Sequence, residues 1–315
     1  MNTSASSAPV GRPDLERAFE HLRVEGAMRP GTPAEMLAGL RAFVDRYGDV
    51  EPRQPTPGVT SRPVTAGSVP CEWVVPDDPV GQGRLVLIHG GGWVAGSFLS
   101  HRAVAGELAL RSGWPVLMVG YRLSPEHAFP AALDDCAQAL EWAWSHGPQG
   151  PEPAGVLALV GDSAGGNLAA ASCVRALETG CRLPSRLALL SGVLDGRPGQ
   201  GRAARGDTQV SDEAIAGVLA MYLQGQTPEE HAWVSPMVAS PETLGKFPPT
   251  LLQASLHEAL YSDAERFHRR LREAGVRCVL SAWPGLPHGW HAFVRHLPEA
   301  RQALSEVASF CTESG

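Results

Sequence analysis

Short apolar runs alternate with helix-like segments along most of the chain, beginning near Cys71. The runs are almost continuously apolar, which is typical of strands buried on both faces of a sheet. They span residues 84–88, 115–119, 156–160, 186–190, 249–254 and 277–282. Helical spacing of apolar residues marks 133–146, 261–274 and 298–311. Such alternation predicts an α/β fold in which helices flank a mostly parallel central sheet.

Two regions interrupt this alternation and predict a helical cap over the sheet. Residues 1–50 have helical spacing and lead into a proline-rich connector over 51–70, which we expect to be extended. The second region, 195–245, begins with a Gly- and Arg-rich loop and continues with a helix-like stretch over 212–223. We expect the core to cover 71–315, with the first region as an N-terminal cap segment and the second as a cap insertion.

Charge and hydropathy argue against several functional classes. The formal net charge of -7 does not suit phosphate backbones, which are bound by clustered Lys and Arg, so we expect no nucleic-acid partner. No stretch reaches the roughly 20 uninterrupted apolar residues of a membrane helix. The first ten residues lack a basic residue before an apolar run and do not resemble a signal peptide. These features predict a cytoplasmic protein without a membrane partner.

The six cysteines show neither C-x-x-C spacing nor a paired His motif. Zinc sites and disulfide scaffolds depend on such spacing. The sequence therefore predicts reduced, packed thiols and no metal site.

The motif G-D-S-A-G at 161–165 lies between the strand expected over 156–160 and a small-residue helix that begins near Gly166. This is the context of the G-x-S-x-G nucleophile turn. A serine in such a turn has a strained backbone, and the flanking glycines avoid collisions with the neighbouring strand and helix. The turn would lift the Ser163 Oγ clear of the sheet. Ser163 is therefore the candidate nucleophile, the alternative being a Gly-rich turn without a catalytic task.

The motif H-G-G-G-W at 89–93 follows the strand expected over 84–88 and lies upstream of the serine, as an oxyanion-hole loop should. Three successive glycines leave backbone N–H groups free to converge on a carbonyl oxygen. A phosphate-binding loop is the competing interpretation, but the Lys-Ser/Thr of a P-loop is absent and Trp93 follows instead. We expect the amides of Gly91 and Gly92, with that of Ala164, to form an oxyanion hole.

A third motif, Y-R-L-S-P-E-H-A-F-P-A-A, occupies residues 121–132. In this order the three motifs resemble those of the hormone-sensitive-lipase-like esterases, the bacterial family IV group. The resemblance runs from about Cys71 to the C-terminus. It implies an α/β-hydrolase core with a helical cap, carboxylesterase activity and no cofactor. In such enzymes the Y-R-L-x-P-E segment is mainly architectural, which implies structural roles for Arg122, Glu126 and His127.

The catalytic histidine is expected late in the chain, because the α/β-hydrolase order is serine, acid, histidine. His288 stands in P-G-L-P-H-G-W, immediately after the last expected strand, and matches the H-G-aromatic pattern of the family. His291 is a near neighbour and the main rival. We favour His288 because it has the expected loop, the expected order and the following glycine.

The acid departs from the family pattern. The family commonly has D-P-L after a strand, whereas residues 256–260 read L-H-E-A-L. Register places Glu258 at the acid position, and Ser-His-Glu triads are a recognised arrangement. Asp263 is the alternative, although a carboxylate in the first turn of a helix is also explained by the helix dipole. Asp162, next to Ser163, is interpreted as a scaffold group.

These residues predict hydrolysis of small, fairly apolar esters or lactones through an acyl-enzyme. The candidate pocket walls are the aromatic and aliphatic residues Trp93, Phe98, Met221, Tyr222 and Trp233. Two alternatives stay open: a non-hydrolytic dehydratase, cyclase or acyl transferase of secondary metabolism on the same fold, and a small-molecule-binding protein. The expected partner is a small-molecule ester. A homodimer is compatible with the sequence.

Overall fold

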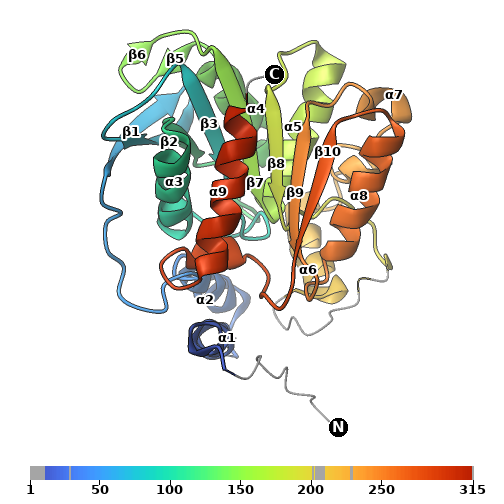
Figure 1. The fold of residues 1–315 in the computed structure, drawn as a ribbon. Coiled ribbons are helices and arrows are strands. Elements are labelled where there is room, and N and C mark those ends of the chain that lie inside the picture. The colour runs from blue at the N-terminus through green and yellow to red at the C-terminus, as the bar shows by residue number, and fades with distance from the viewer. Residues whose placement is uncertain (1–10, 28–29, 201, 203–209, 228–229, 314–315) are drawn as a thin grey trace.

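One mostly parallel sheet forms the centre of the molecule (Figure 1). The structure, a computed structural model, describes residues 11–27, 30–200, 202, 210–227 and 230–313. In these residues, eight strands make up the central sheet, in the order β1-β2-β4-β3-β7-β8-β9-β10. Pairing is antiparallel between β1, β2 and β4, and parallel from β4 onward to β10. The predicted α/β fold with a mostly parallel sheet is confirmed.

The strands of this sheet are β1 (Val59–Ala66), β2 (Val69–Pro76), β3 (Gly83–Ile88), β4 (Val116–Val119), β7 (Val156–Asp162), β8 (Arg186–Leu190), β9 (Thr250–Ser255) and β10 (Cys278–Trp283). The short strands β5 (His146–Gly147) and β6 (Gly150–Pro151) pair separately. The six strands expected from apolar runs agree with the observed strands to within a residue or two. These strands were recognisable because the sheet is buried on both faces, with one hydrophobic core on each side. Along β3, Leu85 and Leu87 pack into the core on one side, and Val86 and Ile88 pack into the core on the other.

Helices cover both faces of the sheet. α3 (Phe98–Ser112) and α9 (Pro298–Thr312) pack on one face and contact each other. α4 (Ala131–Ala143), α5 (Ala164–Thr179) and α8 (Tyr261–Glu273) cover the other face. The short helices are η1 (Pro236–Val238), α7 (Pro241–Leu244) and η2 (Trp290–Phe293).

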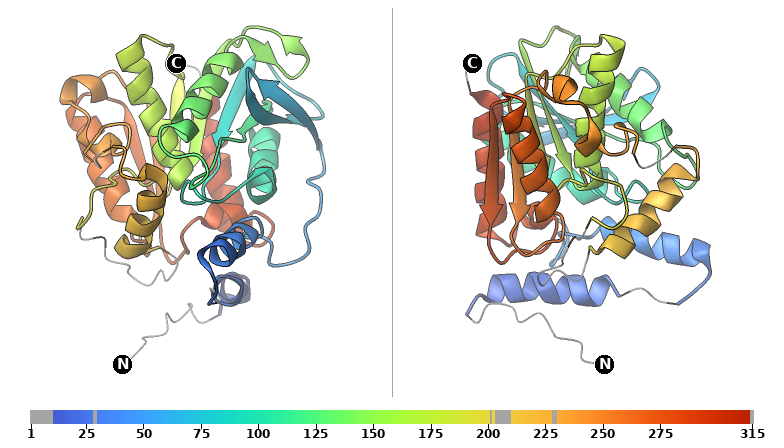
Figure 2. Two further views of the ribbon diagram at one scale, coloured as in Figure 1. Left: turned by 180° about the vertical axis from the view of Figure 1, so that it is seen from behind. Right: turned by 90° about the vertical axis from the view of Figure 1, so that its right-hand side faces the viewer.

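Three further helices, α1 (Pro13–Glu25), α2 (Pro33–Val44) and α6 (Asp212–Leu223), lie together at the lower end of the sheet in Figures 1 and 2. Local sequence sets where α2 begins, because Thr32 and Glu35 form a capping box that satisfies the first amides of the helix. Both regions expected to form a cap therefore contribute helices to the same end of the molecule.

Two elements differ from the sequence prediction. Residues 59–66, inside the expected connector, form β1 and pair with β2 along their whole length, so the sheet begins at residue 59 rather than 71. Most side chains of this edge strand are exposed, and it therefore has no apolar run to reveal it. The helix α3 was also not predicted, because its buried residues include Ser100, His101 and Gly106 and blur the apolar stripe.

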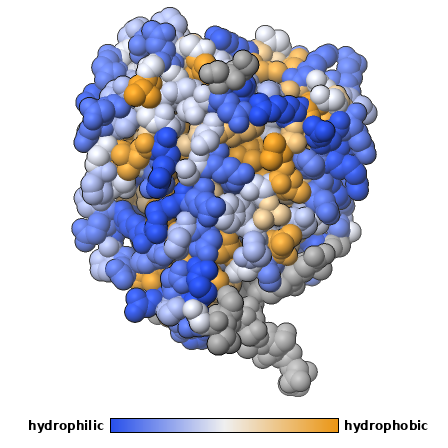
Figure 3. Space-filling model, viewed as in Figure 1, coloured by the Kyte–Doolittle hydropathy of each residue, from blue (hydrophilic) through white to orange (hydrophobic). Residues whose placement is uncertain are grey.

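The surface is mostly hydrophilic, with apolar patches between charged regions on the face drawn in Figure 3. Across the described ranges, we find no helix with the length and apolar character needed to cross a membrane. Residues 1–10, on which the signal-peptide prediction rests, and residues 201 and 203–206 of the expected Gly- and Arg-rich loop lie outside the described residues.

Candidate active site

Ser163 lies in the tight turn between β7 and α5. Its φ of 52° falls in the left-handed region that non-glycine residues rarely adopt. The Ser163 N–H donates to the Leu190 carbonyl at 2.8 Å, which extends the sheet ladder into the turn. A Cβ at Gly161 would lie 2.3 Å from the Gly165 oxygen, and a Cβ at Gly165 would lie 2.2 Å from the Ile88 oxygen. Glycine is therefore required on both sides of the serine.

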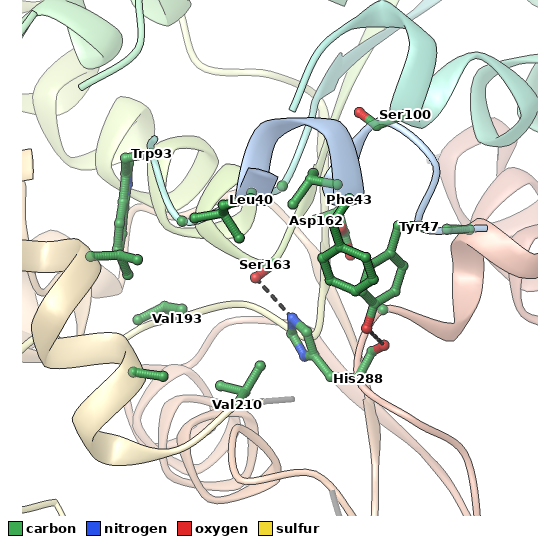
Figure 4. Close-up of a pocket in the computed structure, with 18 of the residues that line it drawn as sticks. Leu40, Phe43, Tyr47, Trp93, Ser100, Asp162, Ser163, Val193, Val210 and His288 are labelled. Atoms are coloured by element: carbon green, nitrogen blue, oxygen red, sulfur yellow. Dashed lines mark hydrogen bonds between the residues drawn. The ribbon is translucent and has the colours of Figure 1, made fainter. Parts of the chain in front are cut away.

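Ser163, His288 and Glu258 form a continuous chain of hydrogen bonds, part of which is drawn in Figure 4. His288 Nε2 lies 2.9 Å from Ser163 Oγ, and His288 Nδ1 lies 2.6 Å from Glu258 Oε2. The side chains of His288 and Glu258 are 9% and 0% exposed. With Nδ1–H donating to the carboxylate, Nε2 is left to accept the serine proton.

Two further donors hold Glu258. Its Oε1 accepts the Ser255 N–H at 2.7 Å and the Ser191 hydroxyl at 2.8 Å. Oε2 is thereby turned toward His288. The structure thus brings Glu258, the residue that the register indicates, to the imidazole.

Asp263, the alternative acid, belongs to a buried ion-pair network instead. Its carboxylate accepts two hydrogen bonds from Arg202 at 3.0 Å and one from Arg266 at 2.9 Å. Its Oδ2 also accepts the amides of Leu194 and Asp195 at 3.0 and 3.1 Å. The side chain is completely buried. Asp263 therefore anchors the start of the insertion to α8.

His291, the rival base, is a buried neutral group. Its Nε2 lies 3.0 Å from Gln253 Oε1, and within the described residues its Nδ1 has no hydrogen-bond partner. Burial lowers the pKa of His291 to about 3. Burial also lowers the pKa of His89, in the glycine-rich motif, to about 3. Of the two candidate bases, His288 is the one that the structure hydrogen-bonds to Ser163.

Gly91 and Gly92 follow β3 and have φ values of 120° and 62°. A Cβ at Gly91 would lie 2.2 Å from the Ala95 oxygen, so this loop conformation requires glycine. Ala164 is the first residue of α5, where an amide has no intrahelical acceptor. Among the described residues, none accepts a hydrogen bond from the amides of Gly91, Gly92 or Ala164. All three amides are therefore available to a ligand.

A second polar contact joins the glycine loop to the serine turn. The Gly90 amide nitrogen lies 3.3 Å from His101 Nε2, and the same imidazole nitrogen lies 3.1 Å from Asp162 Oδ2. Burial by itself would raise the pKa of Asp162, but the hydrogen bond and charge of His101 outweigh it, and the pKa is lowered. His101 thus lies between the glycine loop and the turn that carries Asp162.

Ser163 and His288 face an apolar cavity of about 220 Å³. Its described lining residues are Leu40, Phe43, Val44, Tyr47, Gly90, Gly91, Gly92, Trp93, Ser100, His101, Asp162, Ser163, Val193, Val210, Ala214, Ile215, Val218, His288, Gly289 and Ala292. No group of His, Cys, Asp and Glu side chains in the described ranges is arranged to hold a metal ion. The cavity offers a ligand apolar walls and a polar floor at Ser163.

Of the predicted wall residues, Trp93 lines this cavity, whereas Phe98, Met221, Tyr222 and Trp233 are not among the described lining residues. Tyr222 lies behind Trp93 and stacks on it, with ring centroids 5.1 Å apart. Trp233 is directed away and donates to Glu178 at 2.7 Å. Phe98, the first residue of α3, packs against the core on the face of the sheet that α3 and α9 cover. Aromatic character alone did not distinguish core from cavity.

The N-terminal segment supplies walls that no motif indicated. Leu40, Phe43, Val44 and Tyr47 repeat with the i, i+3, i+4, i+7 spacing of one helix face, and this spacing was the available signal. The Tyr47 hydroxyl donates to the His288 carbonyl at 2.7 Å (Figure 4). The segment around α2 therefore contacts the loop that carries the histidine.

The sequence and the fold are similar to those of known proteins. Residues 85–292 match the family model described as the alpha/beta hydrolase fold. An esterase of Acinetobacter venetianus is 32% identical over 89% of this chain and 91% of its own length. An acetyl-hydrolase of Streptomyces hygroscopicus is 32% identical over 84% of this chain and 90% of its own. The crystal structure of an esterase from the bacterial hormone-sensitive lipase family superposes with a TM-score of 0.85, at 29% identity, over 96% of this chain and 99% of that one.

The free energy of unfolding should fall as the pH is lowered from about 6.5 toward about 3. In this range the unfolded chain protonates His89 and His291, whose ordinary pKa is 6.5, while the folded chain, with both pKa values near 3, keeps them neutral. The unfolded state then binds more protons, and each histidine contributes a slope of up to about 1.4 kcal/mol per pH unit. Urea unfolding at several pH values between 5 and 7 measures this slope. His291→Gln should reduce the slope of the unfolding free energy against pH by the contribution of one histidine, up to about 1.4 kcal/mol per pH unit. An unchanged slope would contradict the conclusion that His291 is neutral in the folded chain.

Proposed function

Because this chain belongs to the α/β-hydrolase family, and within it to the hormone-sensitive-lipase-like esterases, we propose that its carboxylic ester hydrolase activity depends on Ser163, His288 and Glu258. The observation that carries this proposal is the hydrogen-bond chain from Ser163 Oγ through His288 to Glu258, with distances of 2.9 and 2.6 Å. Ser163 is the nucleophile, His288 the base and Glu258 the acid.

In the first half of the reaction, Ser163 Oγ attacks the carbonyl carbon of the ester while His288 Nε2 takes the hydroxyl proton. Glu258 orients the imidazole and stabilises the imidazolium that forms. When the tetrahedral intermediate collapses, the bond to the alcohol oxygen breaks and His288 returns the proton to the leaving alcohol. An acyl-enzyme on Ser163 remains.

Water completes the cycle. A water molecule gives a proton to His288 Nε2 as its oxygen attacks the acyl carbon. The second intermediate then releases the carboxylic acid, and Ser163 Oγ regains its proton from the imidazolium. The net reaction consumes one ester and one water and forms one acid and one alcohol, without a cofactor.

The oxyanion of both intermediates is assigned to the amides of Gly91, Gly92 and Ala164. The support for this is that the loop and the start of α5 leave these amides without acceptors in the described chain. The positive end of the α5 dipole adds to the stabilisation. Each well-placed donor of this kind lowers the barrier by about 2.7–4 kcal/mol.

The substrates are small, fairly apolar esters or lactones. The cavity of about 220 Å³ is smaller than typical ligand pockets of about 300–1,000 Å³. Its walls are aliphatic and aromatic, and Trp93, stacked on Tyr222, closes one side. The similarity to an acetyl-hydrolase supports a preference for short acyl groups.

Ser163→Ala should abolish ester turnover without unfolding the chain. The reason is that the nucleophilic oxygen is lost, whereas the turn keeps its glycines. The measurement is the rate of p-nitrophenyl acetate hydrolysis, together with covalent labelling by a fluorophosphonate probe. An active S163A protein would refute the mechanism. A wild-type chain that binds esters but neither turns them over nor takes the probe would indicate a binding protein instead.

Glu258→Gln should lower kcat by roughly 10⁴-fold, because a neutral amide no longer favours the productive tautomer or stabilises the imidazolium. Asp263→Asn should lower kcat less than about tenfold. It should instead lower the free energy of unfolding by about 3 kcal/mol, since Arg202 loses a buried counter-ion. Steady-state kinetics and urea unfolding of both variants measure these effects. The opposite ranking of kcat would assign the acid to Asp263.

Along a series of p-nitrophenyl esters, kcat/KM should be highest at short acyl chains and fall by about tenfold or more at the decanoate, because the cavity is small. Trp93→Leu should shift the optimum to longer chains by opening the side that this ring closes. The matched control is Trp233→Leu, since Trp233 is not a described lining residue. A flat series in the wild-type chain, or the same shift in both variants, would count against this cavity as the acyl site.

A further inference from the structure

The end of β8 lies between the strand end that carries Ser163 and the strand end that leads to the acid. The register is continuous, because Asp162 pairs with Leu190 and Leu190 pairs with Gln253. The Ser163 N–H donates to the Leu190 carbonyl, and the Ser191 N–H donates to the Gln253 carbonyl, both at 2.8 Å. Ser191 thus stands on β8 where Ser163 stands on β7, at the first position beyond the strand.

Ser191 reaches the triad through its hydroxyl. The residue is completely buried, and its Oγ donates to Glu258 Oε1 at 2.8 Å. The Ser255 N–H donates to the same oxygen at 2.7 Å, and the other oxygen lies 2.6 Å from His288 Nδ1. We propose that Ser191 is a positioning residue for ester hydrolysis, which fixes the carboxylate of Glu258 and, through it, the imidazole of His288. This inference rests on the proposed function, in which Glu258 is the acid.

The backbone of Ser191 supports a role for its side chain. Its φ is 47°, in the left-handed region, where glycine is unstrained and serine is not. Backbone strain of this kind persists where the surrounding contacts fix the conformation of a residue, and it is common at functional sites. Here the strained conformation aims the hydroxyl at a buried carboxylate oxygen.

A glutamate acid depends more than an aspartate acid on a hydrogen bond such as that from Ser191. Its side chain has one more rotatable bond than that of aspartate, so its carboxylate has more orientations to lose before it meets the imidazole. Two donors on Oε1 restrict that freedom and leave Oε2 for His288. Outer contacts that hold a reacting group within a fraction of an ångström are a general requirement for catalysis.

Ser191→Ala tests the inference, because it removes the hydroxyl and keeps the Cβ. With p-nitrophenyl acetate, kcat should fall by about 10- to 100-fold while KM changes little. Ser191→Gly also removes the hydroxyl but relieves the positive φ. It should lose the same kcat, although its melting temperature should exceed that of Ser191→Ala. A Ser191→Gly variant with wild-type kcat would overturn the role of the hydroxyl.

The combination with Glu258→Gln separates positioning from general structural support. Once the carboxylate is gone, Ser191→Ala should reduce kcat little further, so the two effects are not additive. Fully additive losses would overturn the inference. The matched control is Ser172→Ala: Ser172 is 2% exposed, and its Oγ has no hydrogen-bond partner in the described chain. This control should keep wild-type kcat.

The same variants distinguish failure of the inference from failure of the proposed function. If Ser191→Ala keeps wild-type kcat while Glu258→Gln is inactive, the role of Ser191 is overturned and the triad stands. If Glu258→Gln keeps wild-type kcat, the assignment of the acid is overturned, and the role of Ser191 with it.

Discussion

The close packing of α5 against the end of β3 controls the geometry of the site. A side chain at Gly165 would collide with the carbonyl oxygens of Ile88 and His89, at 2.2 and 2.5 Å. Because the helix begins so close to the sheet, the chain reverses direction at Ser163 with a left-handed backbone. The glycine loop lies against the same turn, since a Cβ at Gly90 would be 3.1 Å from the Ser163 Cβ. One packing constraint thus fixes both the proposed nucleophile, Ser163, and the amides assigned to the oxyanion.

The parallel sheet brings the remaining groups to that turn. The carboxyl ends of β7, β8, β9 and β10 lie side by side, and Ser163, Ser191, Glu258 and His288 each follow one of them. Sites at the carboxyl ends of parallel strands are a general property of open α/β sheets. Residues far apart in the sequence are therefore held by one hydrogen-bonded ladder. The segment around α2 closes the arrangement from outside, where Tyr47 contacts the His288 carbonyl.

Where local pattern determines geometry, the structure brings together the residues that the sequence singles out. Ser163 and His288 stand in glycine-containing motifs, and each motif forms a turn. Glu258 stands at the position where the family that the sequence resembles commonly has the acid. The cavity walls were predicted poorly, because they depend on how α2 and α6 dock on the sheet. Thus Tyr222 lies behind Trp93, outside the described cavity lining, although both rings are aromatic and close in space. Ser191 carries no motif, because its role depends on a neighbouring strand rather than on adjacent residues.

The two buried carboxylates near the loop ends differ in how their charge is balanced. Asp263 is neutralised by Arg202 and Arg266, so little of its field is left to act on another group. Within the described residues, the Glu258 carboxylate accepts hydrogen bonds only from the neutral donors Ser191 and Ser255 and from His288, so its charge is still available to an imidazolium. A fixed, uncompensated charge in a water-poor site stabilises a developing positive charge strongly. This difference in charge balance supports the proposal that Glu258, rather than Asp263, is the acid of the triad.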